Sequence, residues 1–178
     1  MNFLHMHKLN KPLTLVGMMG SGKSHLGREL ARALGVPFFD SDAEVEAQAG
    51  LSIAEIFAQK GEPHFRTLEK QAVLDLLERG PCIIATGGGA VMAPETLAAL
   101  QEKSTMVWVQ AGVEDMLERV SHNKDRPLLK NPNPRAVLED LLKLREPLYA
   151  QAHIKVLNRQ RESGQAAQDI LKALNSFE

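Results

Sequence analysis

The sequence has a single cysteine, a formal net charge of only −1 and no long apolar run. Cys82 cannot form a disulfide within the chain, and because it lies in an apolar stretch we expect a buried thiol. Without an excess of basic residues the protein has no field to attract nucleic acid or an anionic membrane, so neither is expected as a partner. No run approaches about 18 apolar residues, which excludes a membrane-spanning helix.

The start of the chain, Met1 to Lys11, lacks the continuous apolar core and the small-residue cleavage site of a signal peptide. We therefore expect a cytoplasmic protein in which residues 1–10 form a loose tail. The remaining residues, 11–178, are predicted to form one domain. A chain of 178 residues with 44% apolar and 24% charged residues has the size and composition of an ordinary globular domain.

The stretch Gly17-Met18-Met19-Gly20-Ser21-Gly22-Lys23-Ser24 matches the phosphate-loop pattern G-x-x-x-x-G-K-[S/T] in full. It follows a short apolar run and precedes a segment with helical spacing of apolar residues, which is the context that the motif requires. Glycines let backbone N–H groups face phosphate oxygens, and the helix N-terminus adds partial positive charge. We expect Lys23 to reach the outer phosphates of ATP and Ser24 to bind Mg²⁺. The expected ATP-binding residues here are Gly20, Ser21, Gly22, Lys23, Ser24 and His25.

Short apolar runs alternate with helical segments along the rest of the chain. The predicted strands are Leu13–Val16, Phe38–Asp40, Cys82–Thr86, Met106–Val109 and Ile154–Leu157. Strands that alternate with helices indicate a parallel sheet covered by helices on both faces, so we predict a three-layer α/β fold.

Acidic residues and glycines follow two of the predicted strands, and ligands of open α/β sheets bind outside the carboxyl ends of the strands. Asp40 ends the second strand, where it could bind Mg²⁺ or cap the next helix. Asp42 fits a cap better, because the helix is predicted to start at Ala43. Gly87-Gly88-Gly89 follows the third strand. Three residues without side chains let a ligand approach the backbone closely, although a simple flexible turn is the alternative.

Two arginines, Arg66 and Arg145, are candidates for binding a small carboxylate, because a planar guanidinium can donate two parallel hydrogen bonds to it. For Arg66 the alternative is an ion pair with Glu69 on the same helix. Residues 121–133 form the longest polar stretch without periodicity and are predicted to be a lid. Arg126 in this lid is a candidate for contacting the transferring phosphoryl group, and a solvent-exposed loop cation is the alternative.

In this order, the motifs resemble those of the shikimate kinase family over nearly the whole chain, from Leu13 to about Leu174. The stretches that carry the resemblance are the phosphate loop, Phe39-Asp40-Ser41-Asp42, Phe65-Arg66-Thr67-Leu68-Glu69, Gly87-Gly88-Gly89, Arg126-Pro127-Leu128-Leu129 and Arg145-Glu146-Pro147-Leu148-Tyr149. The phosphate loop and the glycine run recur in other kinases or are short. Their combination with the aspartate pair and the two arginine motifs is specific.

The resemblance implies transfer of the γ-phosphoryl group of ATP to the 3-hydroxyl of shikimate, within aromatic amino-acid synthesis. It implies the P-loop kinase fold of the nucleoside-monophosphate-kinase type, with a five-stranded parallel sheet in the order 2-3-1-4-5. A substrate-binding helical region over about 42–70 and a lid over about 121–133 are expected within the kinase domain. We also expect a monomer.

The resemblance further implies roles for single residues. Asp42 would bind the substrate hydroxyls and act as the base, and Asp40 would serve Mg²⁺ together with Ser24. Arg66 and Arg145 would hold the substrate carboxylate. The remaining implied site residues are the catalytic Lys23, the phosphate-contacting Arg126, the adenine-stacking Arg119, and the substrate-pocket glycines Gly87, Gly88 and Gly89. Arg159 and Arg161 both remain candidates for a second basic position near the adenine.

Two other functions remain open at this point. A kinase for another small polyhydroxy acid such as gluconate would also use arginines for a carboxylate, although the aspartates, Arg66 and the glycine run together favour shikimate. A non-catalytic domain that senses shikimate is disfavoured because Lys23, Ser24, Asp40 and Asp42 are all present.

Overall fold

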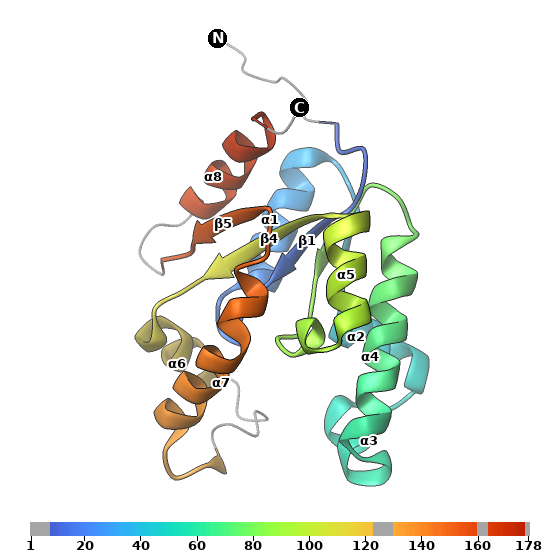
Figure 1. Ribbon diagram of the computed structural model, residues 1–178, viewed down its shortest axis with the longest axis vertical. Coiled ribbons are helices and arrows are strands. Elements are labelled where there is room, and N and C mark those ends of the chain that lie inside the picture. Colours follow the sequence, from blue (N-terminus) through green and yellow to red (C-terminus); the bar gives the residue numbers. More distant parts are fainter. Residues whose placement is uncertain (1–7, 123–129, 160–163, 177–178) are drawn as a thin grey trace.

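Five parallel strands form the central sheet of the computed structural model, in the order β2-β3-β1-β4-β5 (Figure 1). They are β1 (Leu13–Val16), β2 (Phe38–Asp40), β3 (Ile83–Ala85), β4 (Thr105–Gln110) and β5 (Ile154–Leu157). The structure describes residues 8–122, 130–159 and 164–176. The predicted strand order is confirmed. β1, β2 and β5 have the predicted bounds, whereas β3 is one residue shorter at each end and β4 one residue longer at each end.

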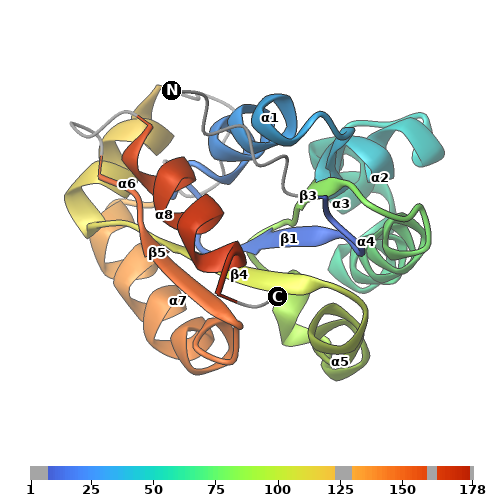
Figure 2. The ribbon, with the colours of Figure 1, turned by 90° about the horizontal axis from the view of Figure 1, so that it is seen from above.

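Helices cover both faces of the sheet and complete the three predicted layers (Figure 2). One face is covered by α1 (Lys23–Leu34) and α8 (Gln165–Leu174). The other is covered by α4 (Glu62–Leu77), α5 (Pro94–Lys103) and α7 (Pro134–Tyr149). The remaining elements are α2 (Ser41–Ala49), α3 (Ile53–Lys60), the short 3₁₀ helix η1 (Ala90–Met92) and α6 (Val113–Ser121). Among the described residues, no helix combines the length and apolar character needed to cross a membrane.

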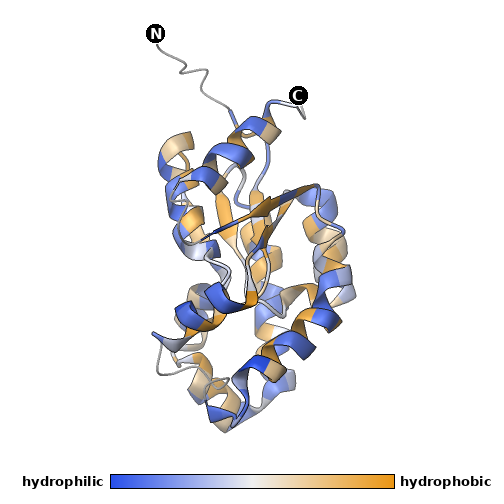
Figure 3. Ribbon diagram, turned by 90° about the vertical axis from the view of Figure 1, so that its left-hand side faces the viewer, coloured by the Kyte–Doolittle hydropathy of each residue, from blue (hydrophilic) through white to orange (hydrophobic). Residues whose placement is uncertain are grey.

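Successive residues of each central strand supply opposite faces of the core, because strand side chains alternate. In β1, Leu13 and Leu15 pack with Leu26 and Leu30 of α1, whereas Val16 belongs to the cluster on the other face. Every residue of β1 is buried, as expected for a central parallel strand covered on both sides. Figure 3 shows the same distribution, with apolar residues concentrated in the strands and polar residues on the outer sides of the helices.

Asp40, at the end of β2, is the N-cap of α2. Its Oδ1 accepts hydrogen bonds from the backbone N–H groups of Asp42 (3.0 Å) and Ala43 (3.4 Å). The prediction that Asp42 is the better cap is wrong, because α2 begins directly after Asp40, two residues earlier than expected. Asp42 instead lies in the first turn, where the helix dipole favours a negative charge. Further along, Ser52 and Glu55 form a capping box at the start of α3.

Some predicted features fall outside the described residues. Of the predicted tail, only residues 8–10 are described, and of the predicted lid only residues 121–122 and 130–133. Arg126 and Arg161 therefore lie outside the part of the chain that the structure describes.

Candidate active site

The predicted phosphate loop connects β1 to α1 at the carboxyl edge of the sheet, which confirms the strand–loop–helix context. Gly17 and Gly20 have φ angles of 147° and 76°, a region that favours glycine. There is also no room for a side chain at either position. A Cβ at Gly17 would lie 2.5 Å from the Val109 carbonyl oxygen, and one at Gly20 would lie 2.6 Å from that of Met116. The loop conformation therefore requires these glycines.

Lys23, the first residue of α1, is buried against this loop. Its Nζ donates hydrogen bonds to the carbonyl oxygens of Gly17 (2.8 Å) and Met18 (2.9 Å). The α1 N-terminus has no side-chain cap and no acidic residue in its first turn. Such a helix start, with a lysine beside it, favours binding of an anion.

Ser24 and Asp40, the two predicted Mg²⁺ ligands, are in direct contact. Ser24 Oγ donates a hydrogen bond to Asp40 Oδ2 at 2.7 Å, while the other carboxylate oxygen of Asp40 caps α2. No cluster of three or more His, Cys, Asp or Glu side chains that could bind a metal occurs among the described residues. A hydroxyl and one carboxylate suit Mg²⁺, which usually takes one or two protein carboxylates and completes its shell with phosphate oxygens and water.

The two predicted carboxylate-binding arginines approach the same glycine turn from different helices. Arg66 comes from α4 and Arg145 from α7. A Cβ at Gly89 would lie 2.6 Å from Arg66 Nη1, and a Cβ at Gly88 would lie 3.3 Å from Arg145 Nη1. The same Cβ at Gly88 would lie 3.5 Å from the backbone nitrogen of Met19 in the phosphate loop. Residues distant in the sequence therefore meet around a backbone turn without side chains.

Arg66 is held by two carboxylates on its own helix. Its Nη1 donates to Glu69 Oε2 at 2.7 Å, and its Nη2 donates to Glu62 Oε1 at 3.2 Å. Burial lowers the pKa of Arg66, but the hydrogen bonds and charges of Glu69 and Glu62 outweigh burial and raise this pKa above its ordinary value. The alternative interpretation of Arg66, an ion pair with Glu69 on the same helix, is thus also present in the structure. This ion pair holds the guanidinium group beside Gly89.

Arg145 is 9% exposed, and its Nε has no hydrogen-bond partner among the described residues. Its Nη1 lies 3.9 Å from the Met18 sulfur. An incompletely paired guanidinium is costly to bury, so a buried arginine of this kind is typical of a site that binds an anion.

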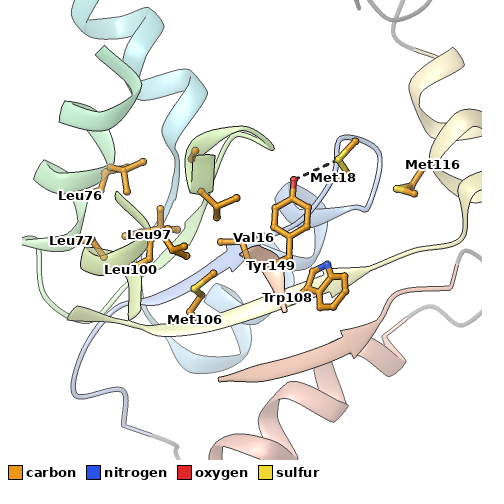
Figure 4. Close-up of a cluster of buried hydrophobic side chains, with 14 of the residues drawn as sticks. Val16, Met18, Leu76, Leu77, Leu97, Leu100, Met106, Trp108, Met116 and Tyr149 are labelled. Carbon is orange, nitrogen blue, oxygen red and sulfur yellow. Dashed lines mark hydrogen bonds between the residues drawn. The ribbon is translucent and has the colours of Figure 1, made fainter. Parts of the chain in front are cut away.

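Tyr149, one turn beyond Arg145 on α7, fixes the glycine turn from the core side. Its hydroxyl donates to the Gly88 carbonyl oxygen at 2.5 Å and lies 3.5 Å from the Met18 sulfur (Figure 4). Burial raises the pKa of Tyr149 to about 12, so the hydroxyl stays protonated and remains a donor. Tyr149 therefore links the glycine turn to the phosphate loop.

Asp42 faces the start of the same turn. A Cβ at Gly87 would lie 2.7 Å from Asp42 Oδ1 and equally close to Glu69 Oε1. The Gly87 N–H donates to the buried Ser41 Oγ at 3.0 Å, which fixes the turn below these carboxylates. Only glycine fits at this position, because the two carboxylate groups occupy the place that a Cβ would take.

The far side of the phosphate loop contacts α6 and the end of β5. Arg119 Nη1 donates to the Gly20 carbonyl oxygen at 3.0 Å, and Asn158 Nδ2 donates to the Ser21 carbonyl oxygen at 2.7 Å. Arg119 therefore lies at the loop, and its implied stacking on adenine stays a prediction. The side chains of His25 and Arg159 are exposed.

Four residues around the site did not stand out as site residues in the sequence. Three of them stand in the stretches that carry the family resemblance but had no role assigned, and only Asn158 had no signal, because its contact with the loop comes from packing between distant segments. These residues are Ser41, Glu69, Tyr149 and Asn158.

The sheet order and the phosphate loop define a P-loop kinase of the nucleoside-monophosphate-kinase type. The family model for shikimate kinase matches residues 19–175. A shikimate kinase of Cereibacter sphaeroides is 46% identical over 169 residues, covering 95% of this chain and 85% of that protein. The chain belongs to the shikimate kinase family, whose members phosphorylate shikimate with ATP.

Solved structures agree with this assignment. The shikimate kinase of Acinetobacter baumannii in complex with shikimate has a TM-score of 0.87 and 39% identity, with 95% of each chain covered. A gluconokinase of Sinorhizobium meliloti has a TM-score of 0.60 at 16% identity, covering 96% of this chain and 95% of that one. The second likeness shows the fold alone.

Proposed function

We propose that the chain binds ATP as its Mg²⁺ complex on the phosphate loop and transfers the γ-phosphoryl group to the 3-hydroxyl of shikimate, held at the Gly87–Gly89 turn. The observation that carries this proposal is the convergence of Arg66 and Arg145 on Gly88 and Gly89, next to the phosphate loop. Phosphoryl transfer has a loose transition state, so positioning and charge neutralisation dominate catalysis.

The substrate carboxylate would be held by the two guanidinium groups. Arg145 supports this role because it is buried and its Nε lacks a hydrogen-bond partner among the described residues. Arg66 is already oriented by Glu69. Planar donors on two sides would fix both the position and the rotation of a small ring acid.

The substrate hydroxyl would be oriented by Asp42, whose carboxylate lies against Gly87 at the start of the glycine turn. In the transfer step the bond between the γ-phosphorus and the β–γ bridging oxygen of ATP breaks, and a bond from the substrate oxygen to the γ-phosphorus forms. The hydroxyl proton passes to the Asp42 carboxylate. ADP is the leaving group.

The nucleotide would be held by the loop N–H groups, by the start of α1 and by Lys23. Ser24 and Asp40 would bind Mg²⁺, which when bound neutralises charge on the phosphate oxygens. Arg126 and the lid over 121–133, the helical substrate region over 42–70, the monomeric state and the cytoplasmic location stay predictions.

A coupled ADP-release assay tests the function directly. With Mg²⁺ and ATP we expect turnover with shikimate and little with gluconate, and phosphorus NMR should identify a monophosphate ester. Lys23→Ala should abolish most turnover without unfolding the protein. Arg66→Ala should raise the KM for shikimate at least about tenfold and leave the KM for ATP nearly unchanged. Equal turnover of gluconate, or binding of shikimate without ADP release, would contradict the proposal.

A further inference from the structure

Asn158 connects the end of the sheet to the phosphate loop. It directly follows β5, and its backbone N–H donates to the Gln110 carbonyl oxygen at 2.8 Å, which continues the pairing of β5 with β4. Its side-chain Nδ2 donates to the Ser21 carbonyl oxygen at 2.7 Å. The side chain is therefore held at a fixed position by the sheet, and it contacts the loop from the side opposite the glycine turn.

A second donor acts on the neighbouring carbonyl group. Arg119 Nη1 donates to the Gly20 carbonyl oxygen at 3.0 Å, and its Nη2 donates to the Asn158 carbonyl oxygen at 3.4 Å. The side chains of Arg119 and Asn158 thus bind two consecutive carbonyl groups of the loop, and Arg119 also binds the backbone of Asn158. The space is closely filled, since a Cβ at Gly22 would lie 2.4 Å from Asn158 Nδ2.

The contact with the Ser21 carbonyl group also determines the direction of the Gly22 N–H group. A trans peptide is planar, with its C=O and N–H groups on opposite sides. The Ser21 carbonyl and the Gly22 N–H belong to the same peptide. When Asn158 holds the carbonyl, the Gly22 N–H must point away from Asn158, and N–H groups of this loop are the donors that bind phosphate.

We propose that Asn158 is a positioning residue for nucleotide binding, which holds the Ser21–Gly22 peptide in the orientation that directs the Gly22 N–H toward the β-phosphate side of the loop. The proposal rests on the proposed function in that the loop is taken to bind ATP. An amide suits this role because it donates a hydrogen bond without bringing a negative charge near the phosphates.

Binding of Mg²⁺·ADP, measured by calorimetry in the absence of shikimate, tests the proposal on the full-length chain. Asn158→Ala should weaken ADP binding roughly 3- to 10-fold through loss of one hydrogen bond. Asn158→Asp should weaken it further, because a carboxylate oxygen would then face the Ser21 carbonyl oxygen and repel the phosphates. Asn175→Asp introduces the same charge change at an exposed position at the end of α8 and should leave ADP affinity at the wild-type value.

Steady-state kinetics distinguish positioning from a general structural role. Asn158→Ala should raise the KM for ATP and not the KM for shikimate, with a melting temperature close to that of the wild type, because the backbone pairing of β5 does not need the side chain. Wild-type ADP affinity in both Asn158 variants would overturn the proposal, and so would a parallel loss of affinity for both substrates. A wild-type protein that binds ADP and does not phosphorylate shikimate would overturn the proposed function alone.

Discussion

Arg66 shares its guanidinium between two carboxylates of very different exposure. The Glu69 side chain is 4% exposed and lies 2.7 Å away, whereas the Glu62 side chain is 61% exposed and lies 3.2 Å away. The buried carboxylate fixes the arginine beside Gly89, and the exposed one occupies an edge of the guanidinium that faces solvent. We therefore expect the two glutamates to act in opposite ways on substrate binding.

Neutralising each glutamate in turn tests this difference. Glu69→Gln should raise the KM for shikimate roughly 3- to 10-fold, because the charge that anchors Arg66 is lost. Glu62→Gln should lower this KM by at most about fivefold, since an exposed ion pair is weak and competes with the substrate carboxylate. The KM for ATP serves as the internal control. A rise of the KM for shikimate in both variants would contradict the assignment.

A single methyl group at the glycine turn should displace Arg66. Gly89 has a φ of −92°, so alanine fits the backbone, but its Cβ would lie 2.6 Å from Arg66 Nη1. We expect Gly89→Ala to fold normally and to raise the KM for shikimate more than about tenfold. Gly112→Ala is the matched control, because a Cβ there meets nothing within 4 Å. Unchanged shikimate kinetics in Gly89→Ala would show that Arg66 does not contact the substrate.

The two roles of Asp40 can be separated by substitution. Asparagine is as good an N-cap as aspartate, so Asp40→Asn should keep the cap of α2 and lose the charge for Mg²⁺. We expect a higher half-saturating Mg²⁺ concentration at an almost unchanged melting temperature. Asp40→Ala should show the same metal defect and also lose about 0.5–2 kcal/mol of stability with the cap. A wild-type Mg²⁺ requirement in Asp40→Asn would exclude Asp40 from the metal site.

His153, which lies away from the active site, should make the stability of the protein depend on pH. Its Nδ1 accepts a hydrogen bond from the Met106 N–H at 2.9 Å, and burial together with the charge of Lys11 lowers its pKa. The folded state thus prefers the neutral ring. This stabilisation is complete above the unfolded pKa of about 6.5 and is lost as the pH falls through the lower folded pKa.

Urea unfolding from pH 8 to pH 5 measures this contribution. The difference in unfolding free energy between the wild type and His153→Ala should shrink as the pH falls. A constant difference would show that the Met106 hydrogen bond does not depend on the protonation of His153.

Much of the fold could be predicted from the sequence, because its signals are local. Apolar runs such as Leu13–Val16 can be recognised within a few residues, and the structure confirms this strand. Local signals also have a limit, because they favoured Asp42 as the cap of α2, whereas the cap is Asp40. Propensity locates a helix start only to within one or two residues, and here the helix follows the strand without a break.

The site could be predicted only where a motif marks it. Ser24 and Asp40 stood out because each has a motif position, and the structure brings them within 2.7 Å. Asn158 has no such signal, since its contact with Ser21 spans 137 residues and depends on β5 lying next to β4. Tyr149 reaches Gly88 only through the packing of α7 on the sheet.

A crystal structure of the protein with ADP, Mg²⁺ and shikimate would show whether Arg66 and Arg145 bind the substrate together. We expect the shikimate carboxylate to lie beside Gly88 and Gly89, with its oxygens about 2.7–2.9 Å from guanidinium nitrogens of both arginines. A carboxylate bound to other groups, with these two arginines directed away from a shared site, would contradict it.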